Sequence, residues 1–170
     1  IQLFGAEPQS MAIAAKMAAE KNPEFIDINM GCPMPKIVNN GDGSALMSDP
    51  KLAEDVVSAV KKAVSLPVGV KIRKGRTYTT VNAPDFAKAL ECGGADFITV
   101  HGRTAAQLYS GEADWTLIGR IRENPRMHIP IIGNGDISSP QKAAEAFDRY
   151  GVDAIMIGRA TYGHPWIFKE

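Results

Sequence analysis

The chain has 170 residues and a mass of 18.3 kDa, with 45% hydrophobic, 22% charged and 7% aromatic residues. These values are typical of one globular domain, and they exclude a disordered tail, a collagen-like repeat and a disulfide-rich miniprotein. Nineteen basic and nineteen acidic residues balance to a formal net charge of zero, which argues against a broad basic face for nucleic acid.

Short β-branched runs alternate with amphipathic helical stretches along the whole chain. Asp49 before Pro50, and Ser139 before Pro140, are typical caps at the start of a helix. Strict alternation of strands and helices predicts an α/β fold with a parallel sheet. In chain order the predicted elements are strand 1–4, helix 9–20, strand 25–30, helix 50–64, strand 68–73, helix 84–91, strand 97–101, helix 115–123, strand 129–133, helix 140–149 and strand 154–158.

Polar or glycine residues follow nearly every predicted strand, and this favours a (β/α)8 (TIM) barrel over an open sheet. In a barrel the carboxyl ends of all strands meet at one rim, whereas an open doubly wound sheet gathers its site at one switch point. The dinucleotide fingerprint G-x-G-x-x-G is also missing after the first strand. A complete barrel takes about 250 residues. We therefore expect residues 1–170 to be a single, incomplete barrel domain of six βα units, holding strands three to eight.

The two cysteines, Cys32 and Cys92, are too few for a disulfide framework and indicate a reducing compartment, the cytoplasm. Cys92, at the end of a predicted helix, is expected to be packed in the core. The chain contains no run of about 18 apolar residues, so no membrane span is predicted. The histidines and cysteines lack the spacing of metal ligands, so no metal site is expected.

Three reactive side chains lie at or near predicted strand ends. The thiol of Cys32 is a candidate nucleophile or general acid, and the residues alone leave both roles open. Lys71 lies among apolar neighbours, so its amine needs an anion, an electron-rich ring or a carbonyl with which to form a Schiff base. His101 ends a strand beside a glycine, where catalytic groups of barrels lie.

The loops after the last two strands have the composition of a phosphate site. Asn134, Gly135 and Asp136 form a glycine-containing turn that lets backbone N–H groups face an anion. Gly158 and Arg159 add a second flexible backbone position and a fixed cation. A phosphate, a cation and a thiol at one rim suit a phosphorylated cofactor such as FMN.

Six motifs in order make the whole chain resemble the tRNA-dihydrouridine synthases. The closing stretch 163–168, Gly-His-Pro-Trp-Ile-Phe, is similar to the bacterial B-type branch of that family. The six motifs are Ile28-Asn29-Met30-Gly31-Cys32-Pro33, Gly43-Ser44-Ala45-Leu46, Val70-Lys71-Ile72-Arg73, Val100-His101-Gly102-Arg103-Thr104, Ile132-Gly133-Asn134-Gly135-Asp136-Ile137 and Met156-Ile157-Gly158-Arg159-Ala160.

The resemblance implies a flavoenzyme that reduces uridine in tRNA to 5,6-dihydrouridine, with FMN as cofactor and NADPH as reductant. It implies that hydride reaches C6 of uracil and that Cys32 gives the proton to C5. It also implies that Gln2 and Lys71 touch the isoalloxazine and that Asn29 and His101 line the same pocket. The residues implied to hold the ribityl phosphate are Asn134, Gly135, Asp136, Gly158 and Arg159.

Two parts of the family have no counterpart in this chain: an amino-terminal loop that cradles FMN and a carboxyl-terminal helical domain that grips tRNA. We therefore expect the chain alone to be inactive on tRNA. Two open strand edges and exposed apolar core also predict self-association or poor stability. The scattered basic residues are interpreted as solvated surface. They are Arg73, Lys74, Arg76, Arg103 and Arg122.

Three other functions remain open. A Schiff-base enzyme would use Lys71 against a phosphorylated carbonyl substrate. A binding module would hold RNA or a partner without any flavin. A flavin-dependent reductase of a free pyrimidine would perform the same chemistry without tRNA.

Overall fold

The structure, a computed structural model, describes residues 1–169. Six parallel strands pair in chain order to form one sheet, and each corresponds to a predicted strand. Within residues 1–169 the sheet ends at the first strand on one side and at the sixth on the other. The strands are β1 (Gln2–Leu3), β2 (Ile26–Asn29), β3 (Val68–Arg73), β4 (Phe97–His101), β5 (Ile131–Asn134) and β6 (Ala154–Met156).

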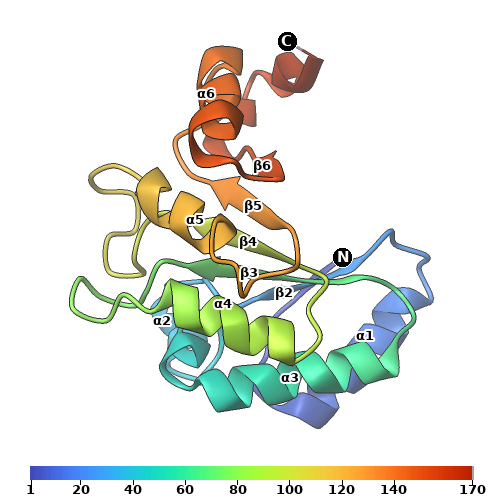
Figure 1. Ribbon diagram of the computed structural model, residues 1–170. Helices are drawn as coiled ribbons and strands as arrows, with labels where there is room; N and C mark the ends of the chain where they lie inside the picture. The colour runs from blue at the N-terminus through green and yellow to red at the C-terminus, as the bar shows by residue number, and fades with distance from the viewer. Residues whose placement is uncertain (170) are drawn as a thin grey trace.

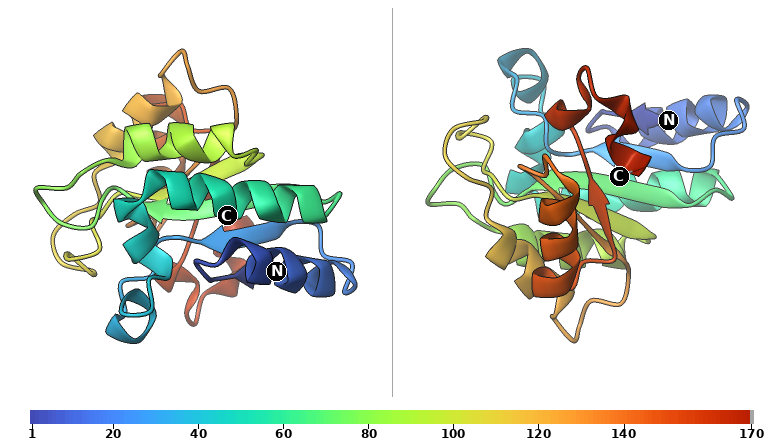
Figure 2. Two further views of the ribbon diagram at one scale, coloured as in Figure 1. Left: turned by 90° about the horizontal axis from the view of Figure 1, so that it is seen from below. Right: turned by 90° about the horizontal axis from the view of Figure 1, so that it is seen from above.

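Five helices connect the strands, at the five predicted places, and all lie on one side of the sheet (Figure 1). Viewed from below, α1, α3 and α4 lie side by side (Figure 2). Strands in sequential order with every helix on one side form the arrangement of a (β/α)8 barrel. The chain thus contains the six expected strands of a partial barrel and the five helices that connect them. The helices are α1 (Pro8–Ala19), α3 (Pro50–Ala63), α4 (Ala83–Cys92), α5 (Trp115–Arg122) and α6 (Pro140–Tyr150).

Both predicted helix caps are confirmed. The carboxylate of Asp49 accepts a hydrogen bond of 3.0 Å from the backbone N–H of Leu52, in the first turn of α3. The hydroxyl of Ser139 accepts one of 3.3 Å from the N–H of Lys142, in the first turn of α6. Each cap satisfies a donor that the helix itself leaves unpaired.

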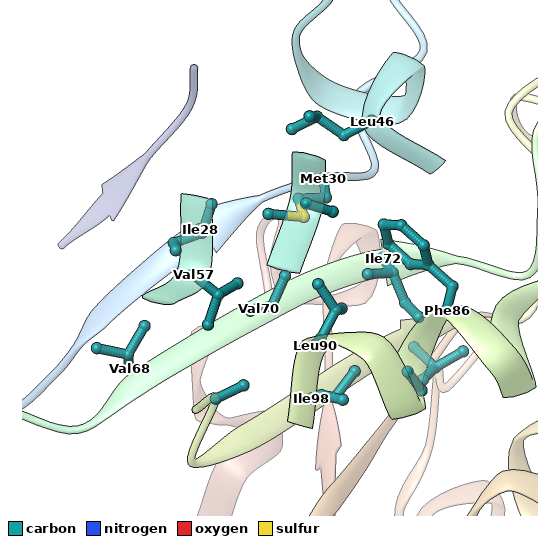
Figure 3. Close-up of a cluster of buried hydrophobic side chains, with 14 of the residues drawn as sticks. Ile28, Met30, Leu46, Val57, Val68, Val70, Ile72, Phe86, Leu90 and Ile98 are labelled. Atoms are coloured by element: carbon teal, nitrogen blue, oxygen red, sulfur yellow. The ribbon is translucent and has the colours of Figure 1, made fainter. Parts of the chain in front are cut away.

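The two faces of the sheet differ sharply in character. Alternate strand residues such as Ile28, Val70 and Ile98 face the helices and pack against Val57 and Leu90 in a fully buried apolar layer (Figure 3). Because side chains alternate along a strand, the residues between them point to the inner face. There the sheet carries charged and polar side chains, and these form the site described below.

The stretch 31–49, between β2 and α3, is partly helical. It contains a short helix, α2 (Pro35–Val38), and a 3₁₀ helix, η1 (Gly43–Ser48). Gly43 has a φ of 59°, and a side chain there would come within 2.8 Å of the carbonyl oxygen of Cys32. Two further 3₁₀ helices, η2 (Arg159–Thr161) and η3 (Pro165–Lys169), follow β6.

The expected packing of Cys92 is wrong, since this thiol is exposed. Phe86, Ala87 and Leu90 form the buried face of α4, and Cys92 lies about 200° around the helix from Leu90. Separately, no helix among residues 1–169 combines the length and the apolar character that crossing a bilayer demands.

Candidate functional site

A cavity of about 1150 Å³ opens at the carboxyl ends of the strands. All ten residues predicted for the site line it, because parallel strands bring their carboxyl ends to one rim. Its volume is sufficient for a nucleotide-sized cofactor, since ligand cavities are typically about 300–1,000 Å³. The ten residues are Gln2, Asn29, Cys32, Lys71, His101, Asn134, Gly135, Asp136, Gly158 and Arg159.

Cys32 is held at the cavity wall through its backbone. The side-chain oxygen of Asn29, the last residue of β2, accepts hydrogen bonds from the N–H groups of Gly31 at 3.1 Å and Cys32 at 2.9 Å. On the other side, the N–H of Ser44 donates to the carbonyl of Cys32 at 3.0 Å. The half-buried thiol is therefore carried by a backbone fixed at two points, as a group that must deliver a proton requires.

Lys71 reaches the cavity from the middle of β3. Burial of its ammonium, together with the nearby charge of Arg73, lowers its pKa to about 8, although Asp27 acts in the opposite direction. Its Nζ donates to the side-chain oxygen of Asn134 at 3.0 Å, and the amide nitrogen of Asn134 donates to the carbonyl of Met156 at 2.7 Å. An electron-rich group in the cavity would stabilise the charged form of this amine.

His101 is uncharged at neutral pH. Burial of its ring lowers its pKa to about 3, with further contributions from the cations Arg73, Lys71 and Arg103. The ring can therefore accept or donate a hydrogen bond, but it adds no positive charge to the cavity.

Arg73 is buried, so the surface interpretation of this residue is wrong. It is 6% exposed, and its guanidinium donates to the carbonyls of Gly31 at 2.9 Å, Thr104 at 2.9 Å and Leu108 at 3.2 Å. It thus ties the loop after β2 to the loop after β4. The signal in the sequence was its spacing, since a residue two positions after Lys71 in a strand lies on the same face.

Arg103 is also buried, so the interpretation of this residue as solvated surface is wrong. Its guanidinium orients the carboxylate of Asp136. The two groups form a fork with both nitrogen–oxygen distances at 2.9 Å, and the N–H of Ala113 adds a third hydrogen bond at 2.8 Å. Burial alone would raise the pKa of Asp136, but these hydrogen bonds outweigh it and hold the pKa below its usual value. The carboxylate of Asp136 is therefore held by other groups of the protein. The part of Asp136 that remains to bind an anion is its backbone.

The end of the cavity beside η2 fits a phosphate. Gly135 has a φ of 128°, a conformation that turns the backbone after β5 back towards the cavity. Among residues 1–169, no group accepts a hydrogen bond from the N–H of Gly158 or Arg159. The half-exposed guanidinium of Arg159 lies 3.4 Å from Asp136 and 4.5 Å from the centre of the Tyr109 ring. Free N–H donors and a held cation are the groups that bind phosphate.

Four aromatic residues of the cavity were not predicted as site residues: Tyr109, Trp115, Tyr150 and Tyr162. The indole of Trp115 donates to the carbonyl of Gly135 at 2.9 Å, and its ring lies so close to Gly133 that any side chain there would collide with it. Tyr109 lies on the long connection after β4, where no periodic pattern reveals its direction. Within residues 1–169 no group of three or more His, Cys, Asp or Glu side chains is placed to hold a metal ion.

Comparison with known proteins relates the whole chain to one family. The profile described as "Dihydrouridine synthase (Dus)" matches residues 1–170. A "Probable tRNA-dihydrouridine synthase" of Rickettsia conorii is 48% identical over all of this chain and 51% of its own length. A "tRNA-dihydrouridine synthase B" of Pseudomonas putida is 45% identical over all of this chain and 50% of its own length. The chain thus spans about half the length of the curated relatives it matches.

Solved structures agree with the fold. A 2-naphthoyl-CoA reductase shares a TM-score of 0.72 at 14% identity, covering 95% of this chain and 28% of its own. A histamine dehydrogenase from Rhizobium sp. 4-9 also gives a TM-score of 0.72, at 20% identity, covering 94% of this chain and 26% of its own. At these identities the likeness shows the fold alone.

Proposed function

Since the chain belongs to the dihydrouridine synthase family, we propose that it is the FMN-binding part of an enzyme that reduces uridine in tRNA to 5,6-dihydrouridine. NADPH is the proposed reductant and the cytoplasm the proposed location. Residues 1–170 would form part of the catalytic barrel, and a helical tRNA-binding domain would lie outside them. The observation that carries the proposal is a single cavity that combines a thiol, a buried amine and a phosphate-binding end.

The cavity residues divide between the two ends of the cofactor. Gly158, Arg159 and the backbone after Asn134 would hold the phosphate through their N–H groups and the guanidinium. Gln2 and Lys71 would contact the ring system, where the charged amine of Lys71 stabilises negative charge. Bound FMN would supply the hydride chemistry at C6 of uracil.

The protein's own residues would complete the reaction at C5. Cys32 gives the proton to that carbon as a general acid, from a backbone that the side chain of Asn29 in β2 and the N–H of Ser44 in η1 hold in place. Asn29 and the neutral ring of His101 line the same pocket and suit an uncharged base such as uracil.

One observation supports a second function. A lysine with a pKa of about 8 is partly uncharged near neutral pH, as a Schiff-base amine must be. Borohydride trapping of a carbonyl substrate on Lys71 would support that function. Family membership favours the flavin reaction, and comparison of free uridine with unmodified tRNA would separate a pyrimidine reductase from a tRNA enzyme.

The proposal is tested by replacing Cys32 in the full-length protein and measuring dihydrouridine in unmodified tRNA. Cys32→Ala should lower the rate by about 10²- to 10⁴-fold, the range for loss of a general acid, while FMN binding is retained. Cys92→Ala is the matched control, because this exposed thiol lies on α4 outside the cavity. Full activity of Cys32→Ala would contradict the proposal.

A further inference from the structure

Asp27 is a buried carboxylate that takes no direct part in the proposed reaction, although its charge favours the charged form of Lys71. It lies in the middle of β2 and is only 6% exposed. Its Oδ2 accepts a hydrogen bond of 2.5 Å from the side-chain nitrogen of Gln2, and its Oδ1 is buried without a hydrogen-bond partner among residues 1–169. Burial raises its pKa, which means that placing the charged form here costs free energy. A carboxylate that is present despite this cost is expected to have a role in the protein.

The carboxylate begins a continuous chain of hydrogen bonds that ends at the backbone of Cys32. The side-chain nitrogen of Gln2 donates to Asp27, and its oxygen accepts from the side-chain nitrogen of Asn29 at 3.0 Å. The oxygen of Asn29 then accepts from the N–H groups of Gly31 and Cys32, at 3.1 and 2.9 Å. Two amide side chains thus connect a buried charge to the loop that carries the thiol.

The direction of every bond in this chain is fixed from both ends. Backbone N–H groups can only donate, so Asn29 must present its oxygen to the loop and its nitrogen to Gln2. Gln2 must then present its oxygen to Asn29 and its nitrogen to residue 27. Only an acceptor at residue 27 completes this pattern, and an ionised carboxylate is purely an acceptor.

We propose that Asp27 is a positioning residue, which orients the amides of Gln2 and Asn29 and through them holds the backbone at Cys32. The same orientation turns the oxygen of Gln2 towards Asn29 and away from the carboxylate, so the face that both amides present to the cavity is set as well. The consequence for proton transfer rests on the proposed function, whereas the hydrogen-bond chain itself does not.

The test measures hydrogen exchange of the Gly31 and Cys32 amides by NMR, with and without FMN. Asp27→Leu removes the acceptor, and Asp27→Asn retains one. Gln2→Glu places a second carboxylate beside Asp27, and two carboxylates have no hydrogen to share in a hydrogen bond. The double variant Asp27→Asn/Gln2→Glu reverses one bond and restores the pattern, because the new amide at position 27 donates to the new carboxylate at position 2, which still accepts from Asn29. Asp96→Asn is the matched control, a carboxylate that caps the N–H of Val68 at the other end of the strands.

Asp27→Leu and Gln2→Glu should each exchange about three- to tenfold faster at these two amides, the effect of losing one modest hydrogen bond. Asp27→Asn, the double variant and Asp96→Asn should exchange at the parent rate. The proposal would be overturned if these two amides exchange at the parent rate in Gln2→Glu, or if they exchange as fast in the double variant as in Gln2→Glu. Both comparisons hold even if Asp27→Leu fails to fold. If the exchange rates follow the expected pattern but the protein binds no FMN, the proposed function is overturned and the positioning role of Asp27 is retained.

Discussion

Replacing Arg103 by methionine should destabilise the fold more than any exposed arginine can. The Arg103 side chain is 3% exposed, and its guanidinium donates to both oxygens of Asp136 and to the carbonyls of Ser110 and Gly111. Methionine fills much of the same space but removes every hydrogen bond that Arg103 donates, and the carboxylate keeps only the N–H of Ala113 and the contact with Arg159.

The size of the loss follows from the burial of the two partners. Removing one member of a buried ion pair costs about 3–5 kcal/mol. The Asp136 side chain is 30% exposed and keeps a contact with Arg159, so water and that arginine compensate in part. We expect a loss of about 3 kcal/mol, a large part of the roughly 5–15 kcal/mol that stabilises a domain.

Urea unfolding followed by circular dichroism measures the loss, with an expected fall in the midpoint of about 1 M. Arg103→Lys should recover about half, because an ammonium keeps the charge but cannot form the fork. Arg149→Met is the control, since its pair with Glu145 is exposed and should contribute less than about 0.5 kcal/mol. An Arg103→Met protein that loses no more than Arg149→Met would refute this reasoning.

Two predictions concern pH, and both are checked by urea unfolding across a pH series. The pKa of Lys71 is about 8 in the folded protein and near 10.5 when unfolded, so the unfolded chain holds the extra proton between those values. Stability should therefore rise by about 3 kcal/mol from pH 8 to 10.5, and Lys71→Met should flatten the rise. The pKa of His101 falls from 6.5 to about 3 on folding, so stability is complete above pH 6.5 and should fall by about 4 kcal/mol towards pH 3. His101→Gln should remove most of this fall, and an unchanged slope in either variant would contradict the assigned pKa.

The two central strands, β3 and β4, were predictable to the residue, and the other four were not. β3 and β4 have the predicted bounds 68–73 and 97–101, and each is rich in β-branched residues. β2, predicted as 25–30, is one residue shorter at each end, and β5, predicted as 129–133, is shifted to 131–134. β1 and β6 each pair with one neighbour only and are shorter than predicted. A strand with a single partner has fewer hydrogen bonds to keep its end residues extended, and hydrophobic pattern alone does not reveal that.

Most members of the site were predictable because parallel strands gather their carboxyl ends at one rim, whereas Gln2 and Asn29 were predicted only from the family resemblance. The supporting residues of the site were not predicted, because Arg73 and Arg103 were judged singly as charged and therefore exposed. Alternation along β3 places Arg73 on the face of Lys71, and that reasoning would have placed it inside. Asp27 carried a similar signal, since a lone carboxylate within the apolar run of β2 implies a buried partner.

The distances that decide function depend on contacts between distant loops. Asp136 and Arg103 lie 33 positions apart, and only the fold shows that the carboxylate faces an arginine. The same applies to the two amides that link Asp27 to the Cys32 backbone, where the sequence shows the residues but not their order of donation. Self-association and inactivity of the chain alone stay predictions.

The central claim is that the cavity binds FMN with its phosphate beside η2. Titration of FMN, followed by flavin fluorescence, tests it directly in the chain, in the full-length protein and in two variants. The account predicts saturable binding that Arg159→Met weakens about 10- to 100-fold, the effect of losing a charge-assisted hydrogen bond. Arg120→Met, an exposed arginine on α5 outside the cavity, should bind as the parent does. Absence of FMN binding in the full-length protein, or equal affinity in both variants, would contradict the account.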